Sequence, residues 1–402
     1  MNNLFITKIM IDALRHVSGL AIPLSEHERK HLILTGKNGS GKTTLLETMR
    51  DYMRRPSFCR DADGSAYLSD PTGTQKPEIH GMNTSEEAFL SPHNKTAGAI
   101  RIYVNAPDGQ PVHGVFNDTL VVYISAHRLL TIPVAKAIER VDAGTHVPLD
   151  ADLSSGFLQY MLYLDYQKLS AASEGNHATE SRIAQWFDRF LQTLREVYGC
   201  PALALKKEAK DLNFNIVMPD REPFSLQHMA DGYSALLKIV MELIMRMEHQ
   251  AHTAYDMPGI VLIDELEAHL HIELQKKVLP FLTGMFPNIQ FIISTHSPFV
   301  ISSIDKAVIY DLEHQQRLED LSAYSYEGIV EYYFNTDMYS DKIKSRFERY
   351  KALIAKIRRT PEENDELVEL IVYLKQIPPA AASELIYSFR ELERQRKDTA
   401  HG

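Results

Sequence analysis

The sequence predicts an α/β protein whose functional groups meet at one edge of a sheet, and three stretches carry this prediction. Residues 31–35 are a short apolar run, followed by the glycine-rich stretch 36–43 and then by a helical pattern. Residues 259–265 and 291–296 are two further apolar runs, and each ends in polar side chains. Because ligands of α/β proteins gather at the carboxyl ends of strands, these polar ends are expected to share one site.

The glycine-rich stretch matches the phosphate-loop pattern G-x-x-x-x-G-K-[ST] at every defined position. It consists of Gly36, Lys37, Asn38, Gly39, Ser40, Gly41, Lys42 and Thr43, and Thr44 follows in the helical pattern. Glycines let backbone N–H groups face a phosphate, and the N-terminus of the next helix adds positive potential. Lys42 is expected to contact the β- and γ-phosphates of ATP, and Thr43 to be a ligand of Mg²⁺. A glycine turn that matches by chance is the alternative, and the strand–loop–helix context argues against it.

Composition limits the class of protein. The 402 residues, 44% of them hydrophobic, allow one large α/β domain with an appendage or two to three modest domains. The net charge of −10 argues against a chain that coats nucleic acid along its whole surface. Cys59 and Cys200 have neither zinc nor disulfide spacing, which suits a reducing cytoplasm. Neither a signal peptide nor an 18-residue apolar stretch is present, so we expect a cytoplasmic protein without a membrane partner.

The first 150 residues are expected to form the phosphate-loop half of the domain. Apolar or alternating patterns predict strands at 4–11, 19–24, 31–35, 99–104, 111–116 and 120–125. The turn signal Pro107-Asp108-Gly109 makes 99–104 and 111–116 a candidate hairpin. Residues 54–95 are rich in proline and glycine and lack apolar periodicity, so they are expected to be an irregular surface insertion.

A helical insertion is predicted at 151–205. Apolar side chains spaced by four, four and three residues define one helix face: Trp186, Phe190, Leu194 and Val197. Phe157, Met161 and Leu164 indicate a partner helix, with a loop at 174–176. We interpret this aromatic stripe as a helix–helix core rather than a cofactor site. The alternating stretch 212–218 then predicts a strand.

The acidic pair Asp264-Glu265 marks the second chemical site. A buried strand has no reason to end in two carboxylates unless a cation or a polar site receives them. We expect Asp264 to hold Mg²⁺ and Glu265 to polarise a water for attack on the γ-phosphate. His296 ends the strand 291–296 and is a candidate γ-phosphate sensor, although a solvated turn histidine is the alternative when it is taken alone.

Five ordered motifs together resemble the ABC-type ATPase head that is also found in SMC and RecF proteins. They are residues 36–43, 229–236, 262–265, 267–271 and 293–298, and the resemblance covers residues 1–310. Within this family, the sequence most resembles compact bacterial ATPases of anti-phage systems, such as the Septu and PARIS ATPase subunits and the heads of OLD-family proteins. The resemblance implies an ABC-type head with a mixed central sheet, whose second half spans 206–325.

In that family two heads enclose two nucleotides, and each signature motif contacts the γ-phosphate bound by the other head. The resemblance therefore assigns Ala230, Asp231, Gly232 and Tyr233 to the ATP site. Ala230 stands where the signature usually has serine, and 125–128 offers no Q-loop glutamine. Both departures favour slow hydrolysis. His269 and His271 are interpreted as dimer-interface residues rather than metal ligands.

Residues 326–402 are expected to be an α-helical tail that docks a partner. The stretch 341–359 carries eight Lys or Arg and two acids, and its apolar residues share one face of a helix. A capping box at 360–363 opens an acidic helix, and a third helix is predicted at 383–397. The basic helix either packs on its acidic neighbour or docks nucleic acid or protein. No H-N-H or Toprim-like pattern occurs, so any cutting of nucleic acid would need another chain.

These features predict an ATPase that binds and slowly hydrolyses ATP between two heads. It would form a homodimer or higher even oligomer and control a separate effector, a nuclease or toxin, in bacterial anti-phage defence. DNA or a phage protein is a candidate trigger. The alternative is a RecF- or SMC-like repair ATPase that clamps DNA, although 153–198 is too short for a long coiled-coil arm. A transporter ATPase is a third hypothesis, and the missing Q-loop glutamine and the long tail argue against it.

Overall fold

The computed structural model describes most of the chain in two compact units, Met1–Tyr324 and Ser325–Gly402. The described residues are 4–54, 57–60, 66–69, 99–105, 119–139, 147–208, 210–249, 255–318, 321, 329, 341–356, 358–377 and 383–400. Each unit is presented by itself. Within these residues, no helix has the length and apolar character that crossing a membrane requires.

A six-stranded sheet forms the centre of the first unit, in the order β14-β13-β3-β12-β11-β7. Its strands are β3 (His31–Thr35), β7 (Leu120–Ile124), β11 (Gly259–Ile263), β12 (Ile289–Ser294), β13 (Ala307–Asp311) and β14 (Gln316–Leu318). All pairs are parallel except β13 with β14. Every residue of β7, β11 and β12 is buried, as expected for a sheet covered on both faces. The predicted mixed α/β sheet is confirmed.

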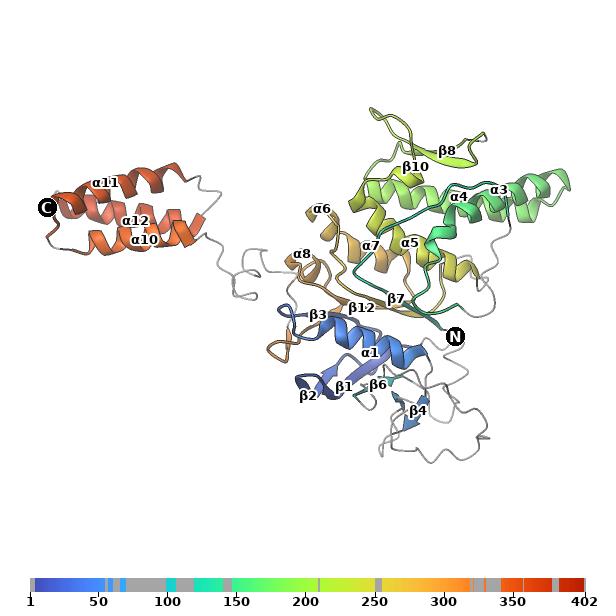
Figure 1. The fold of residues 1–402 in the computed structure, drawn as a ribbon, viewed down its shortest axis with the longest axis horizontal. Helices are drawn as coiled ribbons and strands as arrows, with labels where there is room; N and C mark the ends of the chain where they lie inside the picture. The colour runs from blue at the N-terminus through green and yellow to red at the C-terminus, as the bar shows by residue number, and fades with distance from the viewer. Residues whose placement is uncertain are drawn as a thin grey trace. The chain divides into compact units, whose positions relative to one another are not determined.

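A second, antiparallel sheet packs over one face, in the order β2-β1-β6-β5-β4. Its strands are β1 (Ile6–Leu14), β2 (Val17–Pro23), β4 (Ser57–Arg60), β5 (Ala66–Ser69) and β6 (Ile100–Val104). Helix α1 (Lys42–Arg54) lies between the two sheets, and its apolar side chains join one core with residues from both (Figure 1). Leu45, Met49 and Tyr52 of α1 belong to this core.

The segment 54–95 is therefore only partly as predicted. Its described part is not irregular, because β4 and β5 pair with each other and β5 pairs with β6. The fully buried Leu68 gives the physical reason, since one apolar side chain on the inner face is enough to extend this sheet onto the core. The rest of the insertion, and the second half of the candidate hairpin at 111–116, lie outside the described residues.

Helices cover the other face of the central sheet. Side chains alternate along β11, so Ile260 and Leu262 join the core around α1 while Val261 and Ile263 point away from it. Helices α5 (Asp231–His249) and α7 (Val278–Met285) lie on that opposite side (Figure 1). The short elements here are η2 (Leu226–His228), α6 (Ile272–Gln275) and α8 (Pro298–Ile301). A three-stranded sheet adds β8 (Ala204–Glu208), β9 (Asn213–Val217) and β10 (Phe224–Ser225).

The predicted helix pair is confirmed. After η1 (Ser154–Gly156), helix α3 (Phe157–Ser173) packs on α4 (His177–Tyr198) through aromatic side chains. Phe157 and Phe190 have ring centroids 4.9 Å apart, and Trp186 stacks on Phe190 at 5.8 Å. Asn176 caps α4 by accepting the N–H of Thr179, which explains why the loop falls at 174–176.

The second unit is a bundle of three helices with its own core. It contains α10 (Asp341–Ile354), α11 (Pro361–Gln376) and α12 (Ser383–Ala400), as Figure 1 shows. The Thr360–Glu363 capping box opens α11 as predicted. Arg349 forms an ion pair with Glu366, and Lys356 pairs with Glu363. The basic stretch therefore packs on its acidic neighbour, and its predicted residue Ile357 lies outside the described residues.

Close contact between β7 and β11 generates a stability prediction. A Cβ added at Gly259 would lie 2.8 Å from the Leu120 carbonyl oxygen and 2.9 Å from Leu120 Cβ. Because a backbone atom cannot move aside cheaply, Gly259→Ala should lower the free energy of unfolding by about 1–3 kcal/mol. Gly284→Ala is the control, since nothing lies within 4 Å of its added Cβ, and this helical change should stabilise by about 0.5–1 kcal/mol. Urea denaturation of both variants checks the prediction, and equal stabilities would contradict it.

Candidate nucleotide site

The functional motifs meet because the parallel strands all end at one edge. β3 runs into the phosphate loop, β7 into Ser125, β11 into Asp264, and β12 into Thr295. Gly36, Gly39 and Gly41 have positive φ angles of 126°, 87° and 102°. A side chain at Gly36 would lie 3.0 Å from Ser40 Oγ and 3.1 Å from Asp311 Oδ1, so this tight turn requires glycine. The loop has the strand–turn–helix geometry of a phosphate cradle.

Lys42 is held inside that cradle. Its Nζ donates to the carbonyl oxygens of Gly36 at 2.7 Å and Lys37 at 3.0 Å, and the residue is only 6% exposed. Burial lowers the pKa of Lys42, while Asp264 and three further carboxylates favour its charged form. An ammonium group surrounded by loop carbonyls is placed to meet an incoming phosphate.

Thr43 and Asp264 form the candidate metal position. Thr43 Oγ1 lies 3.2 Å from Asp264 Oδ1, and Ser294 Oγ donates to the same carboxylate oxygen at 2.5 Å. Adjacent ligands of an octahedral Mg²⁺ with bonds near 2.1 Å stand about 3.0 Å apart, so the two oxygens fit one ion. The described residues contain no cluster of three His, Cys, Asp or Glu side chains, which leaves the remaining ligands to phosphate and water.

Glu265 sits in a strained backbone conformation beside the metal position. Its φ of 45° is in the left-handed region, which costs a residue with a side chain about 1–2 kcal/mol. Its N–H donates to Ser294 Oγ at 2.8 Å, and its carbonyl accepts the N–H of Ala268 at 2.8 Å. Among the described residues its carboxylate makes no hydrogen bond or ion pair, so it is free to accept a proton from water.

His296 and Glu267 complete the polar edge. Burial, together with the charge of Lys42, lowers the pKa of His296, so its half-buried imidazole is neutral at neutral pH. The backbone N–H of His296 donates to Glu267 Oε1. Glu267 Oε2 is buried without a hydrogen bond in the described part of the chain. The sequence analysis did not assign a role to Glu267. Its position, two residues after the predicted base Glu265, was the available signal.

Arg128 is the main site residue that sequence reasoning missed. It lies where a Q-loop glutamine was sought and is 1% exposed. Its guanidinium donates to four backbone carbonyls of the turn after β11: Asp264 at 2.7 Å, Glu265 at 2.7 Å, Leu266 at 3.2 Å and Ala268 at 3.4 Å. Burial lowers the pKa of Arg128 to about 10, so it remains charged at neutral pH. An arginine four residues after the end of a buried strand was the available signal.

The signature segment is not brought to its own phosphate loop. No hydrogen bond or ion pair joins 229–236 to 36–43 within the described residues, and α5 lies across the sheet from α1 (Figure 1). Gly232 instead packs on the turn after β11, where an added Cβ would lie 3.2 Å from His271 Cδ2. Tyr233 stacks on Tyr198 with centroids 4.2 Å apart.

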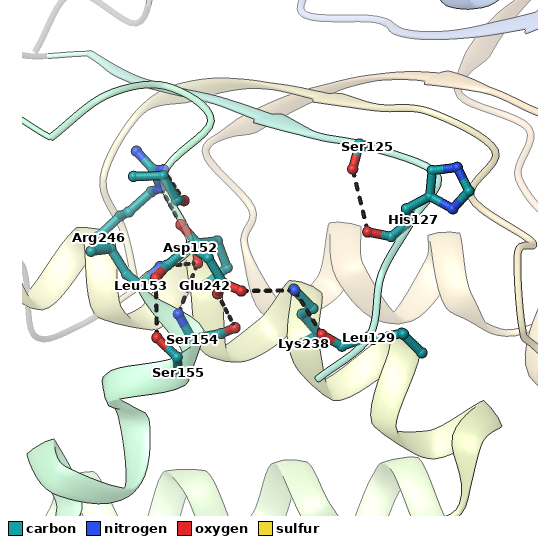
Figure 2. Close-up of polar contacts among 11 residues, drawn as sticks. Ser125, His127, Leu129, Asp152, Leu153, Ser154, Ser155, Lys238, Glu242 and Arg246 are labelled. Atoms are coloured by element: carbon teal, nitrogen blue, oxygen red, sulfur yellow. Dashed lines mark hydrogen bonds and ion pairs between the residues drawn. The ribbon is translucent and has the colours of Figure 1, made fainter. Parts of the chain in front are cut away.

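A polar network, partly exposed at Lys238 and buried at Glu242 and Arg246, ties α5 to the stretch that follows β7. Figure 2 shows Lys238 Nζ donating to the Leu129 carbonyl and to Asp152, both at 2.9 Å. Glu242 accepts the backbone N–H groups of Leu153 and Ser154 and pairs with Arg246 at 2.6 Å. The helix that begins with the signature is thereby fixed to the segment that contains Arg128.

Comparisons with known proteins agree with the motifs. A family model described as "AAA domain, putative AbiEii toxin, Type IV TA system" matches residues 145–302. "Septu protein PtuA" of Bacillus mycoides (strain KBAB4) is 29% identical over 36% of this chain and 22% of that protein. "Retron Ec83 probable ATPase" of Escherichia coli is 33% identical over 30% of this chain and 22% of that protein. The matched region thus spans about a fifth of these two relatives.

A longer match is to the Septu protein PtuA of Bacillus thuringiensis, which is 25% identical over 75% of this chain and 74% of that protein. Among solved structures, the SMC head domain from Thermotoga maritima aligns with 76% of this chain and 94% of its own, at 12% identity and a TM-score of 0.38. The matches in sequence confirm the resemblance that the ordered motifs indicated: this chain is a relative of the ABC/AAA-type ATPases of anti-phage defence systems.

Proposed function

We propose that this protein binds Mg²⁺-ATP between two heads and hydrolyses it slowly to control a separate effector in bacterial anti-phage defence. The observation that carries the proposal is the 3.2 Å contact between Thr43 Oγ1 and Asp264 Oδ1. These side chains are 221 residues apart in sequence, and their contact joins the phosphate loop to the acidic strand end. A phosphate cradle, two oxygen ligands and an adjacent carboxylate are the parts that phosphoanhydride hydrolysis needs.

Each residue has a role in this reaction. The backbone N–H groups of the loop and the Lys42 ammonium bind the β- and γ-phosphates. Thr43 and Asp264 would hold Mg²⁺, which supplies neutralising charge to the phosphate oxygens. Glu265 orients a water and accepts its proton as the water oxygen bonds to the γ-phosphorus and the bond to the β–γ bridging oxygen breaks. His296 donates a hydrogen bond to a γ-phosphate oxygen.

The arrangement within one head supports a two-head site. Residues 230–233 lie at the N-terminus of α5, away from their own phosphate loop, so a second copy is needed to bring a signature to the γ-phosphate. In the two-head arrangement Ala230 offers no hydroxyl, and fewer contacts to the developing charge mean slower hydrolysis. This arrangement supports the proposal of a homodimer or a larger even oligomer.

An ATPase of this kind acts by changing its surface with nucleotide state, and only a partner with different affinity for the two states can respond. The separate helical unit, which has its own core, is the proposed docking element for a nuclease or toxin. DNA or a phage protein is the proposed trigger. Three of the cations at 341–359, Arg349, Lys351 and Lys356, already pair inside the unit, so docking would depend on its remaining surface.

Nucleotide affinity should depend on Lys42. Lys42→Ala removes a charge-assisted contact to the phosphates, worth about 1.5–3 kcal/mol, so ATP affinity should fall at least tenfold. Lys30→Ala is the control, because Lys30 pairs with Glu28 on the surface and should leave affinity unchanged. Titration calorimetry of both variants measures the difference, and equal affinities would exclude the phosphate-loop assignment.

Loss of the base should trap the closed state. Glu265→Gln keeps the shape of the site but cannot accept a proton, so ATP-loaded dimers should accumulate when Mg²⁺ and ATP are added. Light scattering reads the mass directly. The double variant Glu265→Gln/Lys42→Ala should need at least tenfold more ATP to form dimers, because its affinity for ATP is lower by that factor. A Glu265→Gln protein that binds ATP yet remains a monomer at micromolar concentration would contradict the two-head site.

Removing the second unit should abolish binding of the effector but leave ATP binding intact. Deletion of 325–402 leaves the first unit with all the residues of the candidate site, so ATP affinity should stay within about threefold. Co-purification with an effector encoded beside this protein should fall below detection. If the truncated chain still retains that effector, the docking element lies in the first unit instead.

A further inference from the structure

Arg128 makes an unusual set of contacts for a buried arginine. It follows β7, which pairs with β11 in parallel, so its guanidinium reaches the turn that β11 enters. Its bonds to that turn go to backbone carbonyls rather than to carboxylates. Nη1 bonds the Asp264 carbonyl at 2.7 Å, and Nη2 bonds the Glu265 carbonyl at 2.7 Å. The fork of one side chain therefore spans consecutive carbonyls on both sides of the Glu265 α-carbon.

That turn needs such support. Glu265 and His269 both have positive φ angles, 45° and 67°, in a segment without glycine. Residues with side chains keep this conformation only where the surrounding structure enforces it. Ser294 Oγ holds the N–H of Glu265, and Arg128 holds its carbonyl, so the backbone of the base is fixed from both ends. No other side chain among the described residues bonds these turn carbonyls.

We propose that Arg128 is a positioning residue that aims the Glu265 carboxylate at the attacking water, in place of the contacts a Q-loop glutamine would supply. The inference rests on the proposed ATP hydrolysis. Arg128 acts through the backbone of Glu265, because the bonds that its guanidinium makes go to backbone carbonyls. Because its planar fork bonds two carbonyls at once, neither lysine nor glutamine can reproduce the arrangement. Small errors in the placement of a base reduce the rate strongly while leaving substrate binding intact.

Steady-state kinetics of Arg128→Gln and Arg128→Lys test this role. We expect kcat to fall at least 100-fold in Arg128→Gln and at least tenfold in Arg128→Lys, with ATP affinity within threefold of the unchanged protein. Arg246→Lys is the matched control, because Arg246 is also buried and donates to the carbonyls of Pro148, Leu149 and Ala151. Its kcat per folded molecule should stay within threefold. Unchanged kcat in the Arg128 variants would overturn the proposal, as would an equal fall in the control.

A double variant tests whether Arg128 acts through Glu265. If it does, adding Arg128→Lys to Glu265→Gln should lower kcat no further, because the group being positioned is already disabled. A fall that multiplies the two single effects would assign Arg128 an independent role and overturn the proposal.

Hydrogen exchange of the nucleotide-free protein gives a readout that does not depend on hydrolysis. The amides of Leu266 and Ala268 are bonded within the site, to the carbonyls of Ser294 and Glu265. They should exchange at least tenfold faster in Arg128→Lys and not in Arg246→Lys. If the unchanged protein binds ATP without hydrolysing it, the proposed function fails, while this comparison still shows whether Arg128 holds the turn. Equal exchange rates in the two variants would show that Arg128 does not hold the turn.

Discussion

Parallel pairing of β3, β12, β11 and β7 is the constraint on which the rest of the structure depends. Their register places the carboxyl ends of all four strands at one edge, so segments from four distant parts of the sequence become neighbours. Because β7, β11 and β12 are buried on both faces, a slip by one residue would exchange the side chains of the two faces and disrupt the packing on each. The 3.2 Å contact between Thr43 and Asp264 follows from that register.

Main-chain contacts hold the site as much as side-chain contacts do. Ser294 Oγ bonds both the Asp264 carboxylate and the Glu265 N–H, so one hydroxyl fixes the proposed metal ligand and the proposed base together. Arg128 adds a second hold on the same turn from the neighbouring strand. The sequence has no Q-loop glutamine at 125–128, which favours slow turnover. In the structure, Arg128 of the same segment bonds the turn after the acidic strand end instead.

The helical unit changes how the charge pattern of the chain is understood. The stretch 341–359 is strongly basic in sequence, yet Arg349 and Lys356 pair with Glu366 and Glu363. Arg346 lies 4.0 Å from the ring centroid of Tyr373. Surface ion pairs of this kind contribute little stability because water and salt screen them, but they occupy cations that an anionic partner would need. The unit's own hydrophobic core therefore supports the proposed docking role better than its charge does.

By itself, the sequence was enough to predict the residues to which the site's proposed chemistry is assigned. We could predict the phosphate loop, Asp264, Glu265 and His296 because each combines a particular residue type with an apolar strand just before it. Both features can be read from a short stretch of sequence. The helix pair 157–198 and the capping box at Thr360 were predictable for the same reason, since helical spacing and caps are local.

Only the tertiary structure decided which groups support that chemistry. Arg128 bonds carbonyls 136 to 140 residues away, and a backbone carbonyl carries no residue type for a sequence pattern to show. The packing of Gly232 on His271, the orphaned oxygen of Glu267 and the addition of β5 to the antiparallel sheet likewise depend on distant neighbours. Spacing along the chain determines what a segment can form, whereas its partners depend on how the strands pair.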